Sequence, residues 1–221
     1  QLTDKVAFRL TESFAVFIQM RLAKAKPLLV VGRDIRLSSE RIHRKVIEGL
    51  LARGVEIIDV GVVPTGALYF AIPLFKADGA IMITGSHNPA KENGLKFVVG
   101  FYNTNSEDIQ EIKKIAELDR FLPQRRGKVE LREALETYKK MLKANIFSVS
   151  EQKDWQEMVE SLGLEKAIAK GLSLNVDDKP LAGLKVVIDS ANGVASTLPL
   201  EIFRDLGAEV IGIHTEIDGN F

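Results

Sequence analysis

Short apolar runs alternate with amphipathic helical segments along the first 120 residues, and this alternation constrains the fold more than any other feature. Four largely apolar segments of strand length occur, at residues 27–31, 55–60, 79–84 and 95–99, and the first of them is an unbroken apolar run. Such runs are typical of strands that are buried on both faces of a parallel sheet. Because helical periodicity lies between them, we predict a three-layer α/β/α domain with a mixed, largely parallel sheet.

Several residues mark where the predicted helices begin and end. Thr3 or Asp4 precedes the first helix, and Thr65 and Ser106 stand where caps of later helices are expected. Gly54 follows the second helix at a position that favours a left-handed residue. These signals predict helices that alternate with the four strands.

The second half of the chain has a different character. Residues 132–146 and 151–170 have the pattern of amphipathic helices, and the second is expected to bury Trp155, Val159 and Leu162. A strand–helix–strand unit begins at 184–189 (LKVVID), and its order resembles that of the first unit, with Gly207 in the place of Gly54. This weak internal similarity predicts two domains of one plan.

We therefore expect a first domain at 1–145, a helical connection at 146–182 and the beginning of a second domain at 183–221. Two strands and one helix are too little to close an independent core, so the second domain is expected to be truncated. The chain begins with Gln1 rather than Met, which suggests a part of a longer product.

Composition excludes several classes of function. Thirty basic residues balance thirty acidic ones, and cysteine is absent, so disulfides and thiolate metal sites are impossible. The charge balance gives no global support for nucleic-acid binding, and no apolar run approaches the roughly 18–20 residues that span a bilayer. We expect a cytoplasmic protein with no nucleic-acid or membrane partner.

The loop at 84–96 contains the candidate chemistry, because ligands of open α/β sheets gather beyond the carboxyl ends of the strands. Ser86 comes just after the strand at 79–84, and Gly85 is expected to let the backbone approach a ligand. Asn93-Gly94 favours a tight turn that brings Lys96 back toward the loop. The sequence thus predicts a hydroxyl, an imidazole and an ammonium group in one place.

Three interpretations of Ser86 compete. It can be a turn residue that satisfies backbone groups, as Ser, His and Asn commonly do. It can be a hydrolase nucleophile, but TGSHN lacks the second Gly of the G-x-S-x-G elbow, and adjacent side chains such as His87 usually diverge. It can also carry a phosphoryl group, which needs an exposed hydroxyl, nearby donors and usually a divalent ion.

The stretch TGSHNPAKENGLKF (84–97) resembles the active-site loop of the α-D-phosphohexomutases, the phosphomannomutase/phosphoglucomutase family. VGRDIRLSS and DVGVVPTGALYFA resemble two further family segments, although Gly66 replaces a usual Pro. VVIDSANGVAS and EIDGNF resemble the start of the family's second domain. The resemblance covers nearly all of the chain except about 146–180.

This resemblance implies an isomerase of carbohydrate metabolism, an intramolecular phosphotransferase that interconverts hexose 1-phosphate and hexose 6-phosphate. Phosphorylated Ser86 would pass its phosphoryl group to mannose or glucose phosphate, forming a bisphosphorylated hexose. Mg²⁺ would bind an oxygen of the Ser86 phosphate. The family's Asp-Gly-Asp-Gly-Asp magnesium loop does not occur here, so its remaining ligands are expected outside this chain.

The resemblance also suggests roles for the residues around Ser86. Lys96 is implied as a general acid/base or a cationic partner of the phosphoryl group, the alternative being a solvated lysine at a strand edge. His87 is compatible with a bond to substrate or phosphoserine and equally with bracing of the loop. Asn88 is a candidate phosphate-binding residue, but we favour a role in shaping the turn.

Two arginines precede the second helix. Arg33 and Arg36 can offer bidentate donors to phosphate, but for Arg33 we favour a pair with an acidic neighbour that braces the loop. Asp34 is expected to cap or brace the strand-to-helix loop. His43 and His214 have no evident partner in the sequence.

The leading hypothesis is therefore a phosphohexomutase, as a monomer or homodimer, and the alternative is a non-catalytic sugar-phosphate-binding or scaffold relative of that fold. Because sites of the later domains are missing, we expect the 221 residues alone not to turn over substrate.

Overall fold

The computed structural model describes residues 2–118, 121, 126–150, 154–174 and 179–220. The chain forms two compact units, one of Gln1–Glu133 and one of Ala134–Gly219. The sequence predicts that the first domain ends at residue 145, but the division between the units lies earlier, after Glu133. Helix α5 (Leu135–Ser150) continues across residue 145.

The first unit contains a six-stranded mixed sheet of order β5-β4-β3-β1-β2-β6. Its strands are β1 (Leu28–Arg33), β2 (Glu56–Val62), β3 (Gly79–Ile83), β4 (Leu95–Val99), β5 (Tyr102–Asn103) and β6 (Val129–Leu131). β1, β2, β3 and β6 are parallel, whereas β4 pairs antiparallel with β3 and β5 antiparallel with β4. The mixed, largely parallel sheet is thus confirmed.

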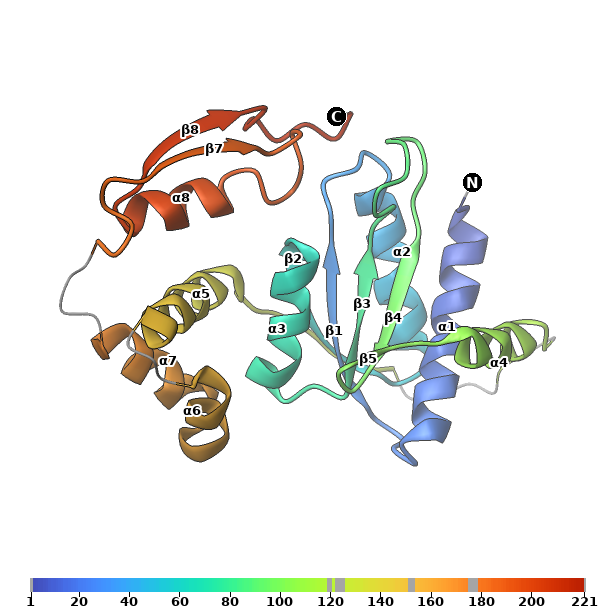
Figure 1. Ribbon diagram of the computed structural model, residues 1–221. Helices are drawn as coiled ribbons and strands as arrows, with labels where there is room; N and C mark the ends of the chain where they lie inside the picture. Colours follow the sequence, from blue (N-terminus) through green and yellow to red (C-terminus); the bar gives the residue numbers. More distant parts are fainter. Residues whose placement is uncertain (1, 119–120, 122–125, 151–153, 175–178, 221) are drawn as a thin grey trace. The chain divides into compact units, whose positions relative to one another are not determined.

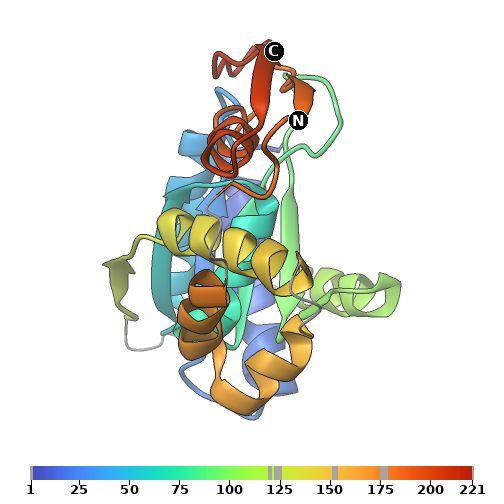
Figure 2. The same ribbon diagram turned by 60° about the vertical axis from the view of Figure 1, so that its left-hand side comes forward.

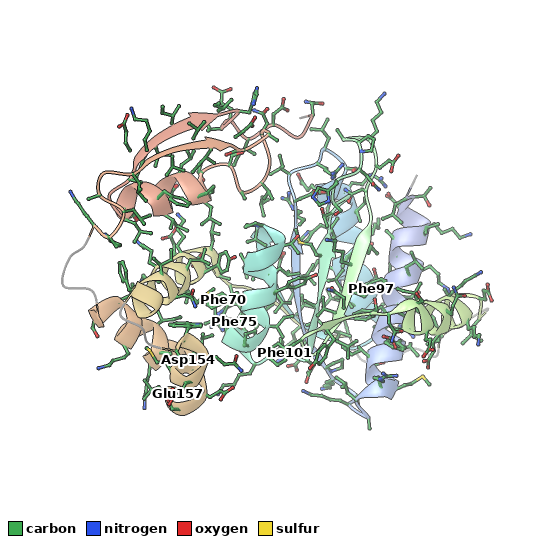
Figure 3. The ribbon with its side chains drawn as sticks, in the orientation of Figure 1. Phe70, Phe75, Phe97, Phe101, Asp154 and Glu157 are labelled. Atoms are coloured by element: carbon green, nitrogen blue, oxygen red, sulfur yellow. The ribbon has the colours of Figure 1, made fainter. Side chains whose placement is uncertain are left out.

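Helices cover both faces of this sheet (Figure 1). Alternate strand residues such as Val31 and Ile81 join Phe14 of α1 (Asp4–Arg21) in one buried cluster, which also takes in α2 (Ser39–Ala52) and α4 (Ser106–Ala116). Phe97 of β4 belongs to the same cluster (Figure 3), and its ring stacks on Phe14 at a centroid distance of 4.4 Å. Helix α3 (Thr65–Phe75) packs on β1 and β3 from the other face, as a right-handed crossover requires.

The helix ends agree only partly with the predicted caps. Thr3 caps α1, and its hydroxyl accepts a hydrogen bond from the Val6 amide. Thr65 is the first helical residue of α3 after the cap Pro64, so its prediction as the cap was wrong. Ser106 likewise is not a cap, because Asn105 caps α4 in a reciprocal pair with Asp108. Asn105, one position before α4, takes the cap because Asp108 stands three residues after it and can return a hydrogen bond.

The second unit combines three helices with a small strand–helix–strand unit. Its elements are α5, α6 (Trp155–Leu162), α7 (Leu164–Leu174), β7 (Lys185–Asp189), α8 (Leu198–Asp205) and β8 (Glu209–Ile213). Helix α5 packs on α7 and α8, and Phe147 of α5 shares a buried cluster with Leu198 and Ile202 of α8. Figure 2 shows the parallel pair β7 and β8 alongside α8.

The helix predicted at 151–170 is two helices in the described residues 154–174, because Gly163 adopts a φ of +80° between them. Asp154 caps α6 by accepting a hydrogen bond from the Glu157 amide (Figure 3). The predicted burial is also wrong, since Trp155 and Val159 are only half-buried and Leu162 is 43% exposed. The break at Gly163 starts a new helix, and α7 supplies the buried Ala167 and Ile168 instead.

The two strand–helix–strand units share the predicted layout. Gly54 follows α2 with a φ of +74°, and Gly207 follows α8 with a φ of +95°. Both values lie in the left-handed region, which glycine adopts without steric cost. Among the described residues, no helix is long and apolar enough to cross a membrane.

Candidate active site

The candidate site lies at the carboxyl edge of the central strands. Arg33, the last residue of β1, pairs in register with Ile83, the last residue of β3, so the loops that follow both strands start side by side. The loop 84–94 then returns through the antiparallel strand β4, and Figure 1 shows it rising beyond the edge of the sheet. The topology therefore brings residues 34–38 and 84–94 together, as expected of a ligand-binding edge.

Ser86 is exposed on this loop and adopts an unusual backbone conformation. Its φ is +54°, in the left-handed region that non-glycine residues seldom occupy. Its amide donates a hydrogen bond of 2.9 Å to the Thr84 hydroxyl, which helps to hold this conformation. A left-handed serine persists only where its surroundings determine the backbone, and such positions are frequent at functional sites.

His87 lies closer to Ser86 than the sequence predicts. Nδ1 of His87 is 3.2 Å from Oγ of Ser86, so the expectation that these adjacent side chains diverge is wrong. The left-handed backbone at Ser86 changes the relative direction of the two side chains. Both are exposed, and the contact is compatible with proton exchange between the hydroxyl and the imidazole.

Arg36 organises the loop from beneath. Its Nη1 donates to the carbonyl oxygens of Pro89 and Glu92 at 2.7 and 3.1 Å. Its Nη2 donates to those of Ser86 and Asn88 at 2.9 and 3.0 Å. Residues 86–92 thus wrap four carbonyl groups around one guanidinium, which is 2% exposed.

Asp34 balances the charge of Arg36. Its Oδ2 accepts a hydrogen bond of 3.0 Å from Nε of Arg36, and its Oδ1 accepts from the Arg36 amide and the Ser39 hydroxyl. Asp34 is 7% exposed, so a buried ion pair stands under the loop. The predicted bracing role of Asp34 agrees with these contacts.

Position 85 requires glycine for a reason other than the predicted close approach of the backbone to a ligand. A Cβ at this position would lie 2.6 Å from Cζ of Arg36 and 2.7 Å from the Glu92 carbonyl oxygen. The missing side chain therefore leaves room for the guanidinium that holds the loop. Sequence reasoning missed this role because the contact joins residues that are 49 positions apart.

The sequence favours Arg33 as the arginine that pairs with an acidic neighbour and braces the loop. In the structure Arg36 does this instead, so that prediction was wrong. Arg33 is half-buried at the end of β1. Among the described residues, no hydrogen bond or ion pair is found for its guanidinium. Arg33 therefore stays a candidate for phosphate binding.

Asn88 and Asn93 play different parts in the loop. The Asn88 amide donates to the Gly85 carbonyl at 3.0 Å, which forms the turn that the sequence predicts there. The tight turn predicted at Asn93-Gly94 is absent from this described segment. Instead, Nδ2 of Asn93 donates at 2.9 Å to both the Ser38 and the Ser39 hydroxyl groups, so its side chain ties the loop to α2.

Lys96 stands near the start of β4, at the loop end of that strand. It pairs in register with Met82 and is half-buried. Because side chains alternate along a strand, Lys96 faces the side of the sheet opposite to that of Phe97. Neither a hydrogen bond nor an ion pair engages its ammonium group among the residues that the structure describes.

Two histidines have carboxylate partners that the sequence does not reveal. Nε2 of His43 on α2 is 3.0 Å from Oδ2 of Asp59 on β2. Burial alone would raise the pKa of Asp59, but the contact with His43, the Gly61 amide and the charge of Arg33 together lower it. In the second unit, the Ala191 amide and then His214, 3.0 Å away, lower the pKa of Asp189.

The donor set around Ser86 does not by itself fit Mg²⁺. This ion prefers several oxygen ligands in octahedral geometry, usually including carboxylates. Within the described ranges no group of three or more Asp, Glu or His side chains is arranged to hold a metal ion. Asp34, the buried carboxylate beneath the loop, is already engaged by Arg36 and Ser39.

Fold and site together define an α/β/α domain that presents an exposed serine on a loop braced by a buried ion pair. The family model of "Phosphoglucomutase/phosphomannomutase, alpha/beta/alpha domain I" matches residues 1–122. The chain belongs to the phosphoglucomutase/phosphomannomutase family.

Relatives over the whole chain agree with this assignment. The phosphomannomutase/phosphoglucomutase of Pseudomonas aeruginosa is 34% identical over 200 residues, covering 90% of this chain and 36% of that protein. The phosphoglucosamine mutase of Caldanaerobacter subterraneus is 32% identical over 220 residues, covering 99% and 43%. A solved phosphoglucomutase/phosphomannomutase family protein from Burkholderia thailandensis has a TM-score of 0.74 at 30% identity, covering 99% and 42%. The chain thus spans about two fifths of the length of these relatives.

Proposed function

We propose that the natural protein containing this chain is a phosphohexomutase that uses Ser86 as the carrier of the phosphoryl group. The observation that carries the proposal is the exposed, left-handed Ser86 on a braced loop of a mutase-family domain. A phosphoryl carrier needs mainly a fixed position and nearby cations, and the G-x-S-x-G elbow of a serine hydrolase does not occur in TGSHN.

The proposed reaction is a transfer and a return. The bond between phosphorus and Oγ of phosphorylated Ser86 breaks while a hydroxyl oxygen of the hexose phosphate bonds to phosphorus, giving a bisphosphorylated hexose and free Ser86. The proton of the sugar hydroxyl passes to a protein base, and a protein acid gives a proton to the departing Oγ of Ser86. After the sugar turns over, Ser86 Oγ loses its proton to a base and takes the other phosphoryl group, while the departing sugar oxygen is protonated. The phosphate thus moves between positions 1 and 6 without hydrolysis.

The residues beside Ser86 suit parts of this reaction. We assign Lys96 as general acid/base or cationic partner of the phosphoryl group, since its ammonium has no other partner among the described residues. His87 is placed to hydrogen-bond the oxygen of Ser86, because its Nδ1 is 3.2 Å from that atom. Arg33 and Asn88 are the proposed phosphate-binding candidates, and the exposed side-chain amide of Asn88 makes no hydrogen bond to the residues that the structure describes.

Mannose or glucose phosphates are the proposed substrates. The Pseudomonas relative is named for mannose and glucose, and the Caldanaerobacter relative for glucosamine, so the three sugars should be compared directly. Mg²⁺ dependence is part of the proposal as well, with the serine phosphate as one ligand. Chelation with EDTA and restoration with Mg²⁺ test it.

Replacement of Ser86 by Ala tests the function. Peptide mapping of the natural protein should find one phosphoryl group on Ser86, and Ser86→Ala should lose both this group and conversion of hexose 1-phosphate to hexose 6-phosphate. Ser106→Ala, at an exposed serine in the first turn of α4, is the matched control and should behave as the parent protein. If Ser86→Ala keeps sugar-phosphate affinity and the parent has no turnover, the protein is a non-catalytic binder instead.

A further inference from the structure

The guanidinium of Arg36 has no donor left for a substrate. An arginine side chain carries five N–H groups. In Arg36 one reaches Asp34, two reach the carbonyl oxygens of Pro89 and Glu92, and two reach those of Ser86 and Asn88. The residue is also 2% exposed. Direct binding of a phosphate by Arg36, which its position in the sequence permits, is therefore incompatible with this structure.

These contacts fix the direction of the peptide groups of the loop. In a planar trans peptide, the N–H of the next residue points opposite to the carbonyl. Because the Ser86 and Pro89 carbonyls point inward to Arg36, the amides of His87 and Ala90 point away from it. Among the described hydrogen bonds, neither of these amides has an acceptor. The guanidinium thus turns the loop so that donors and the Ser86 hydroxyl face outward together.

The same contacts account for the conformation of Ser86. Its carbonyl is held by Arg36 and its amide by the Thr84 hydroxyl, so both peptide groups that flank its φ and ψ angles are fixed. This over-determination is what a left-handed serine requires, since the conformation is unfavourable by itself. Loss of Arg36 would release the carbonyl side and let Ser86 relax.

From these observations we infer that Arg36 is a positioning residue for phosphoryl transfer at Ser86. It orients the hydroxyl and the outward amides of the loop from beneath, and it does not touch the substrate. The inference rests on the proposed function of Ser86. It goes further by assigning the left-handed serine conformation, and the transfer rate that depends on it, to one buried arginine.

The test compares Arg36→Lys and Arg36→Ala with the parent in the natural protein, and with Arg44→Ala as a control. Arg44 is an exposed arginine of helix α2, which begins just after the loop that contains Arg36, and it makes no ion pair or hydrogen bond among the described residues. Lysine keeps the charge beside Asp34 but offers three donors in place of five. Transfer from pre-phosphorylated Ser86 to sugar phosphate is followed in a single turnover, together with kcat and KM.

We expect a fall of about 100-fold in the transfer rate and in kcat for both Arg36 variants, with KM changed less than about threefold, because misplacement by about 1 Å has this effect. Arg44→Ala should match the parent. Free guanidinium ion at non-denaturing concentration should partly restore Arg36→Ala and leave Arg36→Lys unchanged. This selective rescue would show that the guanidinium group itself sets the transfer rate, and the fall in kcat at nearly unchanged KM in a folded variant separates positioning from a loss of fold.

Two results would overturn the inference. One is a folded Arg36 variant that transfers at the parental rate, and the other is a large rise in KM at unchanged kcat, which would make Arg36 a substrate-binding residue. If Arg36→Ala does not fold, Arg36→Lys carries the comparison, with circular dichroism confirming its fold. Ser86→Ala distinguishes failure of the proposed function from failure of the inference about Arg36. Turnover that survives this change would contradict the proposed role of Ser86 itself.

Discussion

Gly85→Ala tests the account of the braced loop most directly, because it adds one methyl group and removes nothing. The new Cβ would lie 2.6 Å from Cζ and 2.8 Å from Nε of Arg36. Non-bonded carbon atoms prefer about 3.5–4.0 Å, so the guanidinium would have to retreat by about 1 Å. Gly85 is not among the glycines with positive φ, so the effect comes from crowding alone.

The size of the effect follows from what a retreat would break. The hydrogen bonds from Arg36 to the loop carbonyls measure 2.7–3.1 Å, and a shift of about 1 Å carries most of them beyond bonding distance. Overpacking of a filled site usually costs about 1–3 kcal/mol. We expect Gly85→Ala to lower the free energy of unfolding by this amount and to release the loop.

Urea denaturation of the variant and its parent measures this difference, and proteolysis within 84–94 reports the release of the loop. Gly94→Ala is the matched control in the same loop, since its added Cβ would meet only the Thr84 carbonyl oxygen, at 3.3 Å. In an Arg36→Ala background, the cost of Gly85→Ala should shrink, because the guanidinium is gone and the Glu92 carbonyl, 2.7 Å from the added Cβ, is no longer held by it. Equal losses for Gly85→Ala and Gly94→Ala, or strict additivity with Arg36→Ala, would refute the reasoning.

Two further predictions concern contacts that the sequence did not reveal. Asn93→Ala removes the donors to the Ser38 and Ser39 hydroxyl groups, and should lower the free energy of unfolding by about 1–2 kcal/mol in urea denaturation. Asp59 has a pKa below its ordinary value of 3.8, so its stabilising contribution is complete above that pH and is lost as pH falls through the folded-state pKa. Asp59→Asn should therefore reduce the loss of stability as the pH falls below 3.8, and an unchanged pH dependence of the free energy of unfolding in this range would contradict the role given to His43.

The alternation of apolar runs and helical periodicity was enough to predict the layers and the strands of the first unit. This succeeded because burial of strand residues such as Val31 and Ile81 is a local consequence of pattern. The loop at Ser86 could be located for the same reason, since it follows the end of a predicted strand. Helix caps were less predictable, because neighbouring residues such as Asn105 and Ser106 compete for one position.

The internal construction of the loop could not be predicted, because it depends on contacts across about 50 residues. Asn93-Gly94 has the local preference of a tight turn, but two hydroxyl groups of α2 engage the Asn93 side chain and the backbone takes another course. Arg36 and Asp34 are two residues apart, which hints at a pair. Their real partners are backbone carbonyls, and the direction of a carbonyl leaves no trace in the sequence.

The residues that fix the geometry of the Ser86 loop differ from those that can supply positive charge to it. Asp34 neutralises Arg36, and every guanidinium donor is used, so the ion pair supplies geometry and little net charge. A phosphoryl group on Ser86 would add a charge of about −1.5 to −2 at neutral pH. Under the proposed function, the compensating charge must then come from elsewhere. Lys96, His87 and Arg33 are candidates for this role near the loop, since none of the three makes an ion pair with a carboxylate among the described residues, and a divalent ion would supply the rest. Rigidity and charge at this serine are thus assigned to different residues, so substitutions can alter one and leave the other unchanged.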